Sequence, residues 1–215
     1  MSNKQTTTDK RRWFEILSVV LTGLLKYVLM DWLELRVFYI FSVCLFWTLY
    51  ILKRYQVNRD ILRDWGFRKP GFKRTLRFCL PFTVVTLIGI FGYEIFYNNG
   101  FLKWNLVPVL ALYPLWGIIQ QFLMISVIAG NMRAVSSLNM SDNHVILVVS
   151  LLFSIVHYPD LILMAFTFVM ELFFISAYFR WRNLWALGIL HGWLGGLFLY
   201  LVVHRDLWRE LWMIF

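Results

Sequence analysis

The sequence predicts an all-α membrane protein, a polytopic bundle of about seven transmembrane helices. Of its 215 residues, 60% are hydrophobic and only 15% are charged, whereas a soluble domain carries about 25% charged residues. The apolar residues also form blocks of roughly 17–25, the length that a helix needs to cross a hydrocarbon core of about 30 Å. We therefore expect a single membrane-embedded domain over residues 13–215, after a disordered cytoplasmic tail over residues 1–12.

Seven apolar segments follow one another along the chain: 13–34, 37–52, 76–97, 104–129, 144–158, 160–180 and 184–203. Because lipid offers no hydrogen-bond partners, the backbone of each segment must satisfy itself as a helix. The runs are too long for the strands of a membrane barrel, and the alternation typical of such strands is absent. The first segment contains Glu15 and Lys26 and no cleavage site follows it, so we interpret it as a retained helix, spanning or interfacial. An eighth crossing is left open.

The charged residues between these segments predict their orientation. Lys and Arg gather at the N-terminus, across residues 53–77, at Arg133, and at Arg180 and Arg182. Each stretch follows an even number of crossings, so all of them lie on one side, which the positive-inside rule identifies as the cytoplasm. We therefore expect an integral protein of the bacterial inner (cytoplasmic) membrane with a cytoplasmic N-terminus.

The net charge of +9 and the position of the basic residues also indicate which molecules the protein binds. Cations beside apolar runs are expected to contact anionic lipids of the inner leaflet, so membrane lipids are expected partners and nucleic acid is not. Cys44 and Cys79 lie in or beside apolar runs and provide neither a disulfide framework nor a CxxC metal motif. After Val203, paired charges predict a short amphipathic helix along the interface.

Five polar side chains lie within the predicted spans, on four successive segments: Gln120, Gln121, His157, Glu171 and His191. Ionisable groups are costly inside a membrane, so each is a functional hypothesis. A site built from several facing helices would have this distribution. The structural alternatives are interhelical hydrogen bonds for the glutamines, an interfacial helix cap for the first histidine, and a buried ion pair for the glutamate.

Two stretches, residues 153–157 and 178–191, resemble motifs of the CPBP family of intramembrane proteases, which includes CAAX prenyl endopeptidases and bacteriocin-processing proteins. Phe153-Ser154-Ile155-Val156-His157 matches the family's Phe-x-x-x-His motif in full. The approach from Tyr178 to His191 is similar to that of its third motif, His-x-x-x-Asn or His-x-x-x-Asp. The resemblance covers about residues 116–200 and implies a membrane helical bundle that hydrolyses a peptide bond in a membrane-embedded or lipid-linked peptide.

The chain departs from the family pattern at the first and third motifs. The first motif is Glu-Glu-x-x-x-Arg, but Gln120 and Gln121 stand at the glutamates and Ile125 at the arginine. Gly195 replaces the Asn or Asp of the third motif. A glutamine amide has an acceptor oxygen but no usable basicity, so the two glutamines can position water or a carbonyl and cannot replace the base.

The resemblance and the polar residues together give the leading interpretation, an intramembrane endopeptidase with a relocated base. Glu171 would accept the proton of an attacking water, and His157 and His191 would orient the reactants. These three side chains would also offer a two-histidine, one-carboxylate set for zinc or another divalent metal, with a position left for water. No other cofactor is expected.

Two other functions are weighed against it. One is a catalytically inactive scaffold or regulator of the same fold, which binds a transmembrane or envelope partner. The other is a small-molecule transporter, which the absence of an inverted repeat disfavours. The protease interpretation also carries a geometric condition. His157 meets the other residues only if segment 144–158 is tilted, starts deeper, or ends inside the bundle, as Pro159 would permit.

Overall fold

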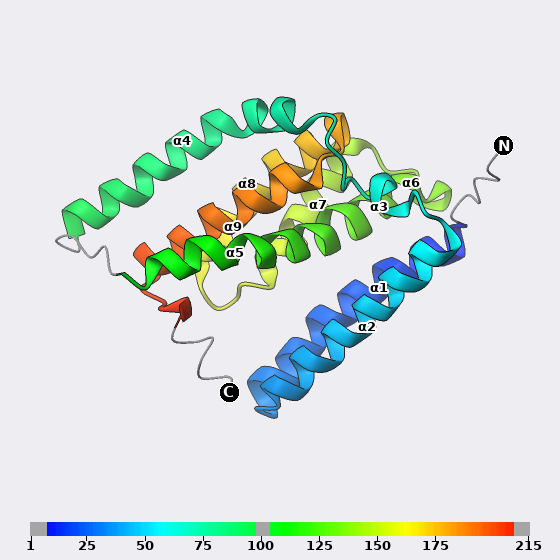
Figure 1. The fold of residues 1–215 in the computed structure, drawn as a ribbon, viewed down its shortest axis with the longest axis horizontal. Helices are drawn as coiled ribbons and strands as arrows, with labels where there is room; N and C mark the ends of the chain where they lie inside the picture. The colour runs from blue at the N-terminus through cyan, green and yellow to red at the C-terminus, as the bar shows by residue number, and fades with distance from the viewer. Residues whose placement is uncertain (1–7, 98–103, 209–215) are drawn as a thin grey trace.

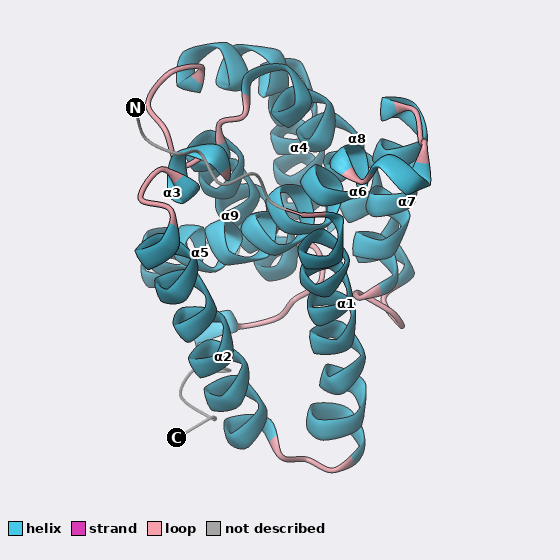
Figure 2. Cartoon of the chain, turned by 90° about the vertical axis from the view of Figure 1, so that its right-hand side faces the viewer, coloured by secondary structure: helices cyan, strands magenta, loops and turns pink. Residues whose placement is uncertain are grey.

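The computed structural model describes residues 8–97 and 104–208, which form helices and loops without a β-strand (Figures 1 and 2). In chain order the elements are α1 (Asp9–Lys26), η1 (Tyr27–Trp32), α2 (Arg36–Val57), α3 (Ile61–Asp64), α4 (Phe72–Tyr97), α5 (Leu106–Gln121), η2 (Phe122–Ala129), α6 (Gly130–Ala134), η3 (Ser136–Leu138), α7 (Asp142–Ile155), α8 (Leu161–Trp181) and α9 (Leu184–Leu201). Within these residues, six helical segments are long and apolar enough to cross a membrane, and α7 is shorter. The predicted all-α, polytopic bundle is confirmed, with a helix in each predicted segment.

The N-terminal boundary differs from the expected one. Disorder was predicted through residue 12, but α1 already begins at Asp9. The Asp9 carboxylate lies in the first turn, where the helix dipole favours a negative charge. It also accepts a hydrogen bond from the Ser136 hydroxyl at 2.6 Å. Residues 1–7 lie outside the described part, as does most of the predicted amphipathic helix after Val203, because the described chain ends at residue 208.

Helix α9 is the central helix of the bundle. Other parts of the protein bury 83% of its apolar span, against 6% for α2. Helix α5 runs along α9, α4 contacts both α9 and α8, and α7 packs on α8. Figure 1 shows α1 and α2 as a hairpin beside this core. The polar residues that lie on α5, α8 and α9 are therefore held in the most enclosed part of the fold.

Three glycines let α5 and α9 cross in backbone contact. A Cβ atom on Gly117 would lie 2.5 Å from the nitrogen of Gly192, and one on Gly188 would lie 2.6 Å from the Cα of Ile118. A Cβ on Gly192 would in turn lie 2.6 Å from the nitrogen of Pro114. Small residues permit such close approach between membrane helices. The crossing lies directly beside Gln120, Gln121 and His191, and so fixes their separation.

The turn between α8 and α9 is fastened to the loop before α4. The buried Asn183 side chain caps α9 by accepting from the Ala186 amide at 3.0 Å, and its amide nitrogen donates to the Pro70 carbonyl at 3.1 Å. The Leu184 amide donates to the Gly66 carbonyl at 2.9 Å. Gly66 has a φ of +102°, a conformation that glycine adopts without steric cost. These bonds fix the starts of α4 and α9 side by side.

A buried polar cluster attaches the α1–α2 hairpin to the core. Glu15 is 1% exposed and pairs with Arg54 of α2, with 3.4 Å between Oε1 and Nε. Its other oxygen, Oε2, accepts from the Asn131 amide of α6 at 2.5 Å, and the Tyr50 hydroxyl donates to Oε1. A buried carboxylate needs such partners. Glu15, a charged residue in the first predicted span, thus connects α1 with α2 and α6.

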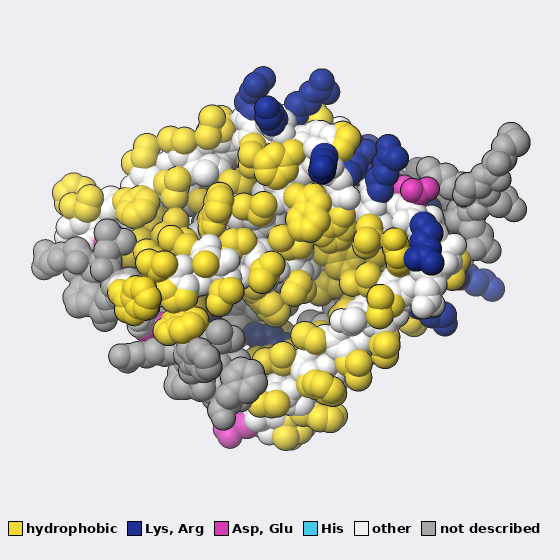
Figure 3. Space-filling model, in the orientation of Figure 1, with side chains coloured by type: hydrophobic (Ala, Val, Ile, Leu, Met, Phe, Trp, Pro, Cys, Tyr) yellow, Lys and Arg dark blue, Asp and Glu magenta, His cyan; other side chains and the backbone are white. Residues whose placement is uncertain are grey.

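Lys and Arg side chains gather along one edge of the molecule, and the face beside them is largely hydrophobic (Figure 3). This edge contains the starts of α1 and α4, with Lys10, Lys73 and Arg74 exposed on them. An apolar belt bordered by cations on one side is the pattern expected of a protein that crosses a membrane.

Candidate active site

Three helices bring four of the five predicted residues into one hydrogen-bonded chain. The Gln121 amide nitrogen on α5 donates to Glu171 Oε2 on α8 at 2.9 Å, and it lies 3.0 Å from His191 Nδ1 on α9. His191 Nε2 lies 2.9 Å from Gln120 Oε1. Glu171 and Gln121 are fully buried, and His191 is 3% exposed. The site is a polar cluster midway along the spans, enclosed by apolar packing.

The hydrogen bonds assign the tautomer of His191. An amide nitrogen only donates, so Nδ1 of the ring must be the acceptor from Gln121. The hydrogen of the neutral ring is then on Nε2, which donates to Gln120 Oε1. The two adjacent glutamines therefore hold the imidazole from both of its nitrogens and fix its orientation.

The same cluster contains two buried acceptors without a donor. Among the described residues, neither Glu171 Oε1 nor Gln121 Oε1 has a hydrogen-bond partner. An unsatisfied buried polar group costs about 1–3 kcal/mol, so such groups in native proteins call for an explanation. These oxygens can accept from a water molecule or from the N–H of a peptide. The cluster thus has the acceptors that a hydrolytic reaction requires, beside an oriented imidazole.

His157 lies outside this chain of hydrogen bonds. It follows α7, and its Nδ1 lies 2.8 Å from the carbonyl oxygen of Phe153, to which it donates. The ring of Phe153 lies 4.9 Å from the ring of His157 and 5.5 Å from that of His191, between centroids. The phenyl ring therefore contacts both imidazoles, and the matching Phe-x-x-x-His motif brings its histidine near the cluster without a hydrogen bond to it.

The length of α7 accounts for this position. The helix has 14 residues, a length of about 21 Å at 1.5 Å per residue, which is less than a hydrocarbon core of about 30 Å. The segment is therefore too short to cross by itself. The chain turns at His157 and enters α8 at Leu161.

The expected zinc set is not formed. His157, His191 and Glu171 were predicted as two histidines and a carboxylate around a divalent metal. In the described part of the chain, no group of three or more His, Cys, Asp or Glu side chains converges closely enough to hold a metal ion. The Gln121 amide lies between Glu171 and His191, and an amide NH₂ group directed at both of them cannot donate an electron pair to a metal. The donor set does not fit zinc.

Gly195 leaves space next to His191. A Cβ atom added there would lie 3.7 Å from His191 Nε2 and 3.7 Å from Cε1 of Tyr113, which are ordinary van der Waals distances. The family motif has an Asn or Asp at this position, whereas the glycine provides no side chain to contact the imidazole. Ile125, at the arginine position of the first motif, is fully buried in the hydrophobic core.

Sequence reasoning did not identify the α5 residues that form the α5–α9 crossing. Gly117 and Tyr113 of α5 contact α9 beside the site. Three of the four glycines of α9 recur every fourth residue, at Gly188, Gly192 and Gly196, and this small-xxx-small spacing is the signal that predicts a close helix partner.

The comparison with known proteins agrees with the motifs. Residues 75–197, more than half of the chain, match the family of type II CAAX prenyl endopeptidase Rce1-like proteins. No curated protein and no solved structure matches the chain. The matched region contains α5, α8 and most of α9, and thus the whole hydrogen-bonded cluster. The chain is an integral membrane protein and belongs to the Rce1-like, CAAX-protease family that its histidine motifs predicted.

Proposed function

We propose that this protein is an intramembrane endopeptidase that hydrolyses a peptide bond in a membrane-embedded or lipid-linked peptide, with Glu171 as the proton acceptor. The observation that carries the proposal is the fully buried Glu171 carboxylate, joined through Gln121 to His191. Glu171 supplies the basicity that glutamine at positions 120 and 121 lacks. It does so from a different helix, α8, across the same cluster.

The reaction needs one proton acceptor and one group that polarises the carbonyl. A water molecule bound at Glu171 Oε1 loses a proton to the carboxylate as its oxygen attacks the carbonyl carbon. The carbonyl oxygen replaces Gln120 as the acceptor of the hydrogen on His191 Nε2, so the developing negative charge meets an oriented donor. Glu171 then gives its proton to the leaving amine as the C–N bond breaks. Gln121 holds both Glu171 and His191 in place.

His157 has a supporting role in this proposal. Its hydrogen bond to the Phe153 carbonyl holds the end of α7 against the ring that contacts His191. The histidine orients the reactants indirectly, by positioning that ring.

A catalytically inactive scaffold or regulator is the second candidate. It is favoured by Gly195, which leaves His191 without the side chain that the family has at this position, and by the absence of a hydrogen bond between His157 and the cluster among the described contacts. Such a protein would keep the fold and bind a transmembrane or envelope partner.

Peptide cleavage by the full chain in lipid nanodiscs distinguishes the two candidates. The probes are a prenylated peptide ending in a CAAX sequence and an unprenylated transmembrane peptide, with products identified by mass spectrometry. The wild-type protein is expected to cleave at least one of them. Glu171→Gln, which can still accept the hydrogen bond from Gln121, is expected to lower the rate by at least about 10²-fold at unchanged thermal stability.

The matched control is Glu94→Gln, since Glu94 is a 5% exposed carboxylate on α4 outside the cluster. This variant should retain cleavage. Wild-type-like cleavage by Glu171→Gln would refute the assigned base. Binding of a probe by the wild-type protein without cleavage would support the scaffold.

We also propose that the protein is a single membrane domain of the bacterial inner membrane with a cytoplasmic N-terminus. The cations at the starts of α1 and α4 support this orientation through the positive-inside rule. A cysteine introduced at Lys10, in a chain without Cys44, should react with a membrane-impermeant reagent only after the cells are opened.

A further inference from the structure

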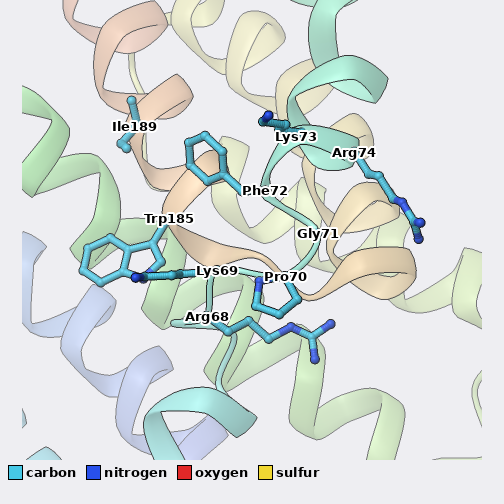
Figure 4. A pocket seen from close by; sticks show the side chains of 9 residues that line it. All are labelled: Arg68, Lys69, Pro70, Gly71, Phe72, Lys73, Arg74, Trp185 and Ile189. Carbon is cyan, nitrogen blue, oxygen red and sulfur yellow. The ribbon is translucent and has the colours of Figure 1, made fainter.

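A pocket of about 810 Å³ lies where the loop before α4 meets the start of α9. Figure 4 shows the side chains around it, with the apolar groups of Phe72, Trp185 and Ile189 on one side and Lys69 extended toward Trp185. The complete lining is Arg68, Lys69, Pro70, Gly71, Phe72, Lys73, Arg74, Trp185 and Ile189. The pocket is separate from the polar cluster, since it contains none of the residues of that cluster.

Four of the nine lining residues are cationic and none is acidic. Lys69, Lys73 and Arg74 are exposed, and no ion pair to them occurs among the described residues. Arg68 donates from Nη2 to the Trp181 carbonyl at 2.8 Å, while its Nε is buried and has no partner in the described part. Like charges held together without counter-charges favour binding of an anion.

The rest of the lining is largely apolar. The ring of Trp185 meets that of Phe67 edge to face, with centroids 5.1 Å apart, and Trp185 is still 41% exposed. Ile189 lies one turn further along α9, toward the middle of the membrane. Tryptophan at the end of a span is typical of the membrane–water interface. The pocket thus has cations at the interface and an apolar wall that continues into the membrane.

We propose that this pocket binds one anionic phospholipid. The phosphate lies between Lys69 and Lys73, and an acyl chain follows Phe72, Trp185 and Ile189. An anionic head with an apolar tail matches both parts of the lining, whereas inorganic phosphate would match only the cations. The bound lipid would fasten the starts of α4 and α9, which the Asn183 hydrogen bonds already hold together.

Native mass spectrometry of the full chain in detergent, titrated with phosphatidylglycerol or phosphatidylcholine, tests the proposal. The wild-type protein should retain one phosphatidylglycerol in preference to phosphatidylcholine. Replacing Lys69 and Lys73 with Ser should lower that affinity about thirty-fold, at about 1 kcal/mol for each cation near an anionic lipid. Replacing the same two residues with Arg should preserve it, which separates lost charge from misfolding.

The matched control removes two exposed cations outside the pocket, Lys53 and Arg63. This pair of changes to Ser should alter the affinity less than about two-fold, because these side chains do not line the site. An equal loss in both double variants would overturn the proposal in favour of diffuse attraction. Unchanged binding in the Lys69 and Lys73 variant, or displacement of the lipid by inorganic phosphate alone, would also overturn it.

Discussion

The crossing of α5 and α9 makes Gly192→Ala the most informative single substitution. A Cβ at this position would lie 2.6 Å from the nitrogen of Pro114 and 2.8 Å from the carbonyl oxygen of Tyr113. Both atoms belong to the backbone and cannot move aside as a flexible side chain would. To reach an ordinary separation of about 3.5 Å the helices must part by about 1 Å.

The magnitude of the effect follows from that separation. Overpacking of this kind costs about 1–3 kcal/mol of stability. The hydrogen bonds that His191 accepts from Gln121 and donates to Gln120, at 3.0 and 2.9 Å, join the same two helices and would stretch beyond the hydrogen-bonding range. The variant should therefore lose both thermal stability and cleavage activity.

The assay is thermal unfolding in nanodiscs, followed by tryptophan fluorescence. Two glycine-to-alanine changes serve as controls. No atom lies within 4 Å of a Cβ on Gly89 of α4, and the nearest atoms to one on Gly195 are at 3.7 Å. Both should leave stability unchanged or raise it by up to about 1 kcal/mol, since alanine favours a helix. If Gly192→Ala unfolds at the same temperature as these controls, the backbone contact does not hold the site together.

Two further substitutions test the buried charges. Gln121→Glu places a second carboxyl group where the Gln121 amide now lies 2.9 Å from Glu171 Oε2. At about pH 5 the two carboxyl groups can share a proton, whereas at about pH 8 two buried negative charges would face each other. Because the folded variant then binds more protons than the unfolded chain, its stability should fall as pH rises, and more steeply than that of the wild type. Thermal unfolding measured across pH checks this, and equal slopes for the two proteins would contradict it. Glu15→Gln removes the carboxylate that pairs with the buried Arg54 and should cost about 3–5 kcal/mol in chemical unfolding. Asp142→Asn, which breaks the exposed pair with Arg133, should cost less than about 1 kcal/mol.

The helices and the membrane class were predictable because they depend on local composition. An apolar run long enough to cross lipid has only the helix available to it. The first residue of α1 was less predictable, since the helix extends to Asp9 and Arg11, polar residues that precede the apolar run. Hydropathy gives no information about such an extension.

The partners of the site residues were only partly predictable. Glu171, Gln121 and His191 were expected to converge because membrane helices bury ionisable groups together. The position of Gln121 between the other two depends on the backbone contact at Gly117, which no single motif encodes. His157 was expected to join them, but the short α7 and its turn place it against Phe153 instead.

The position of Gln121 has a consequence for how charge can move through the site. Its amide nitrogen gives its two hydrogens to Glu171 and His191 and keeps no basic lone pair. The amide therefore holds the two side chains in a fixed relative orientation but does not relay a proton between the carboxylate and the imidazole. A proton taken up by Glu171 cannot pass along the chain of hydrogen bonds to His191. In the proposed reaction this proton therefore leaves through a molecule bound in the site, the amine of the cleaved peptide.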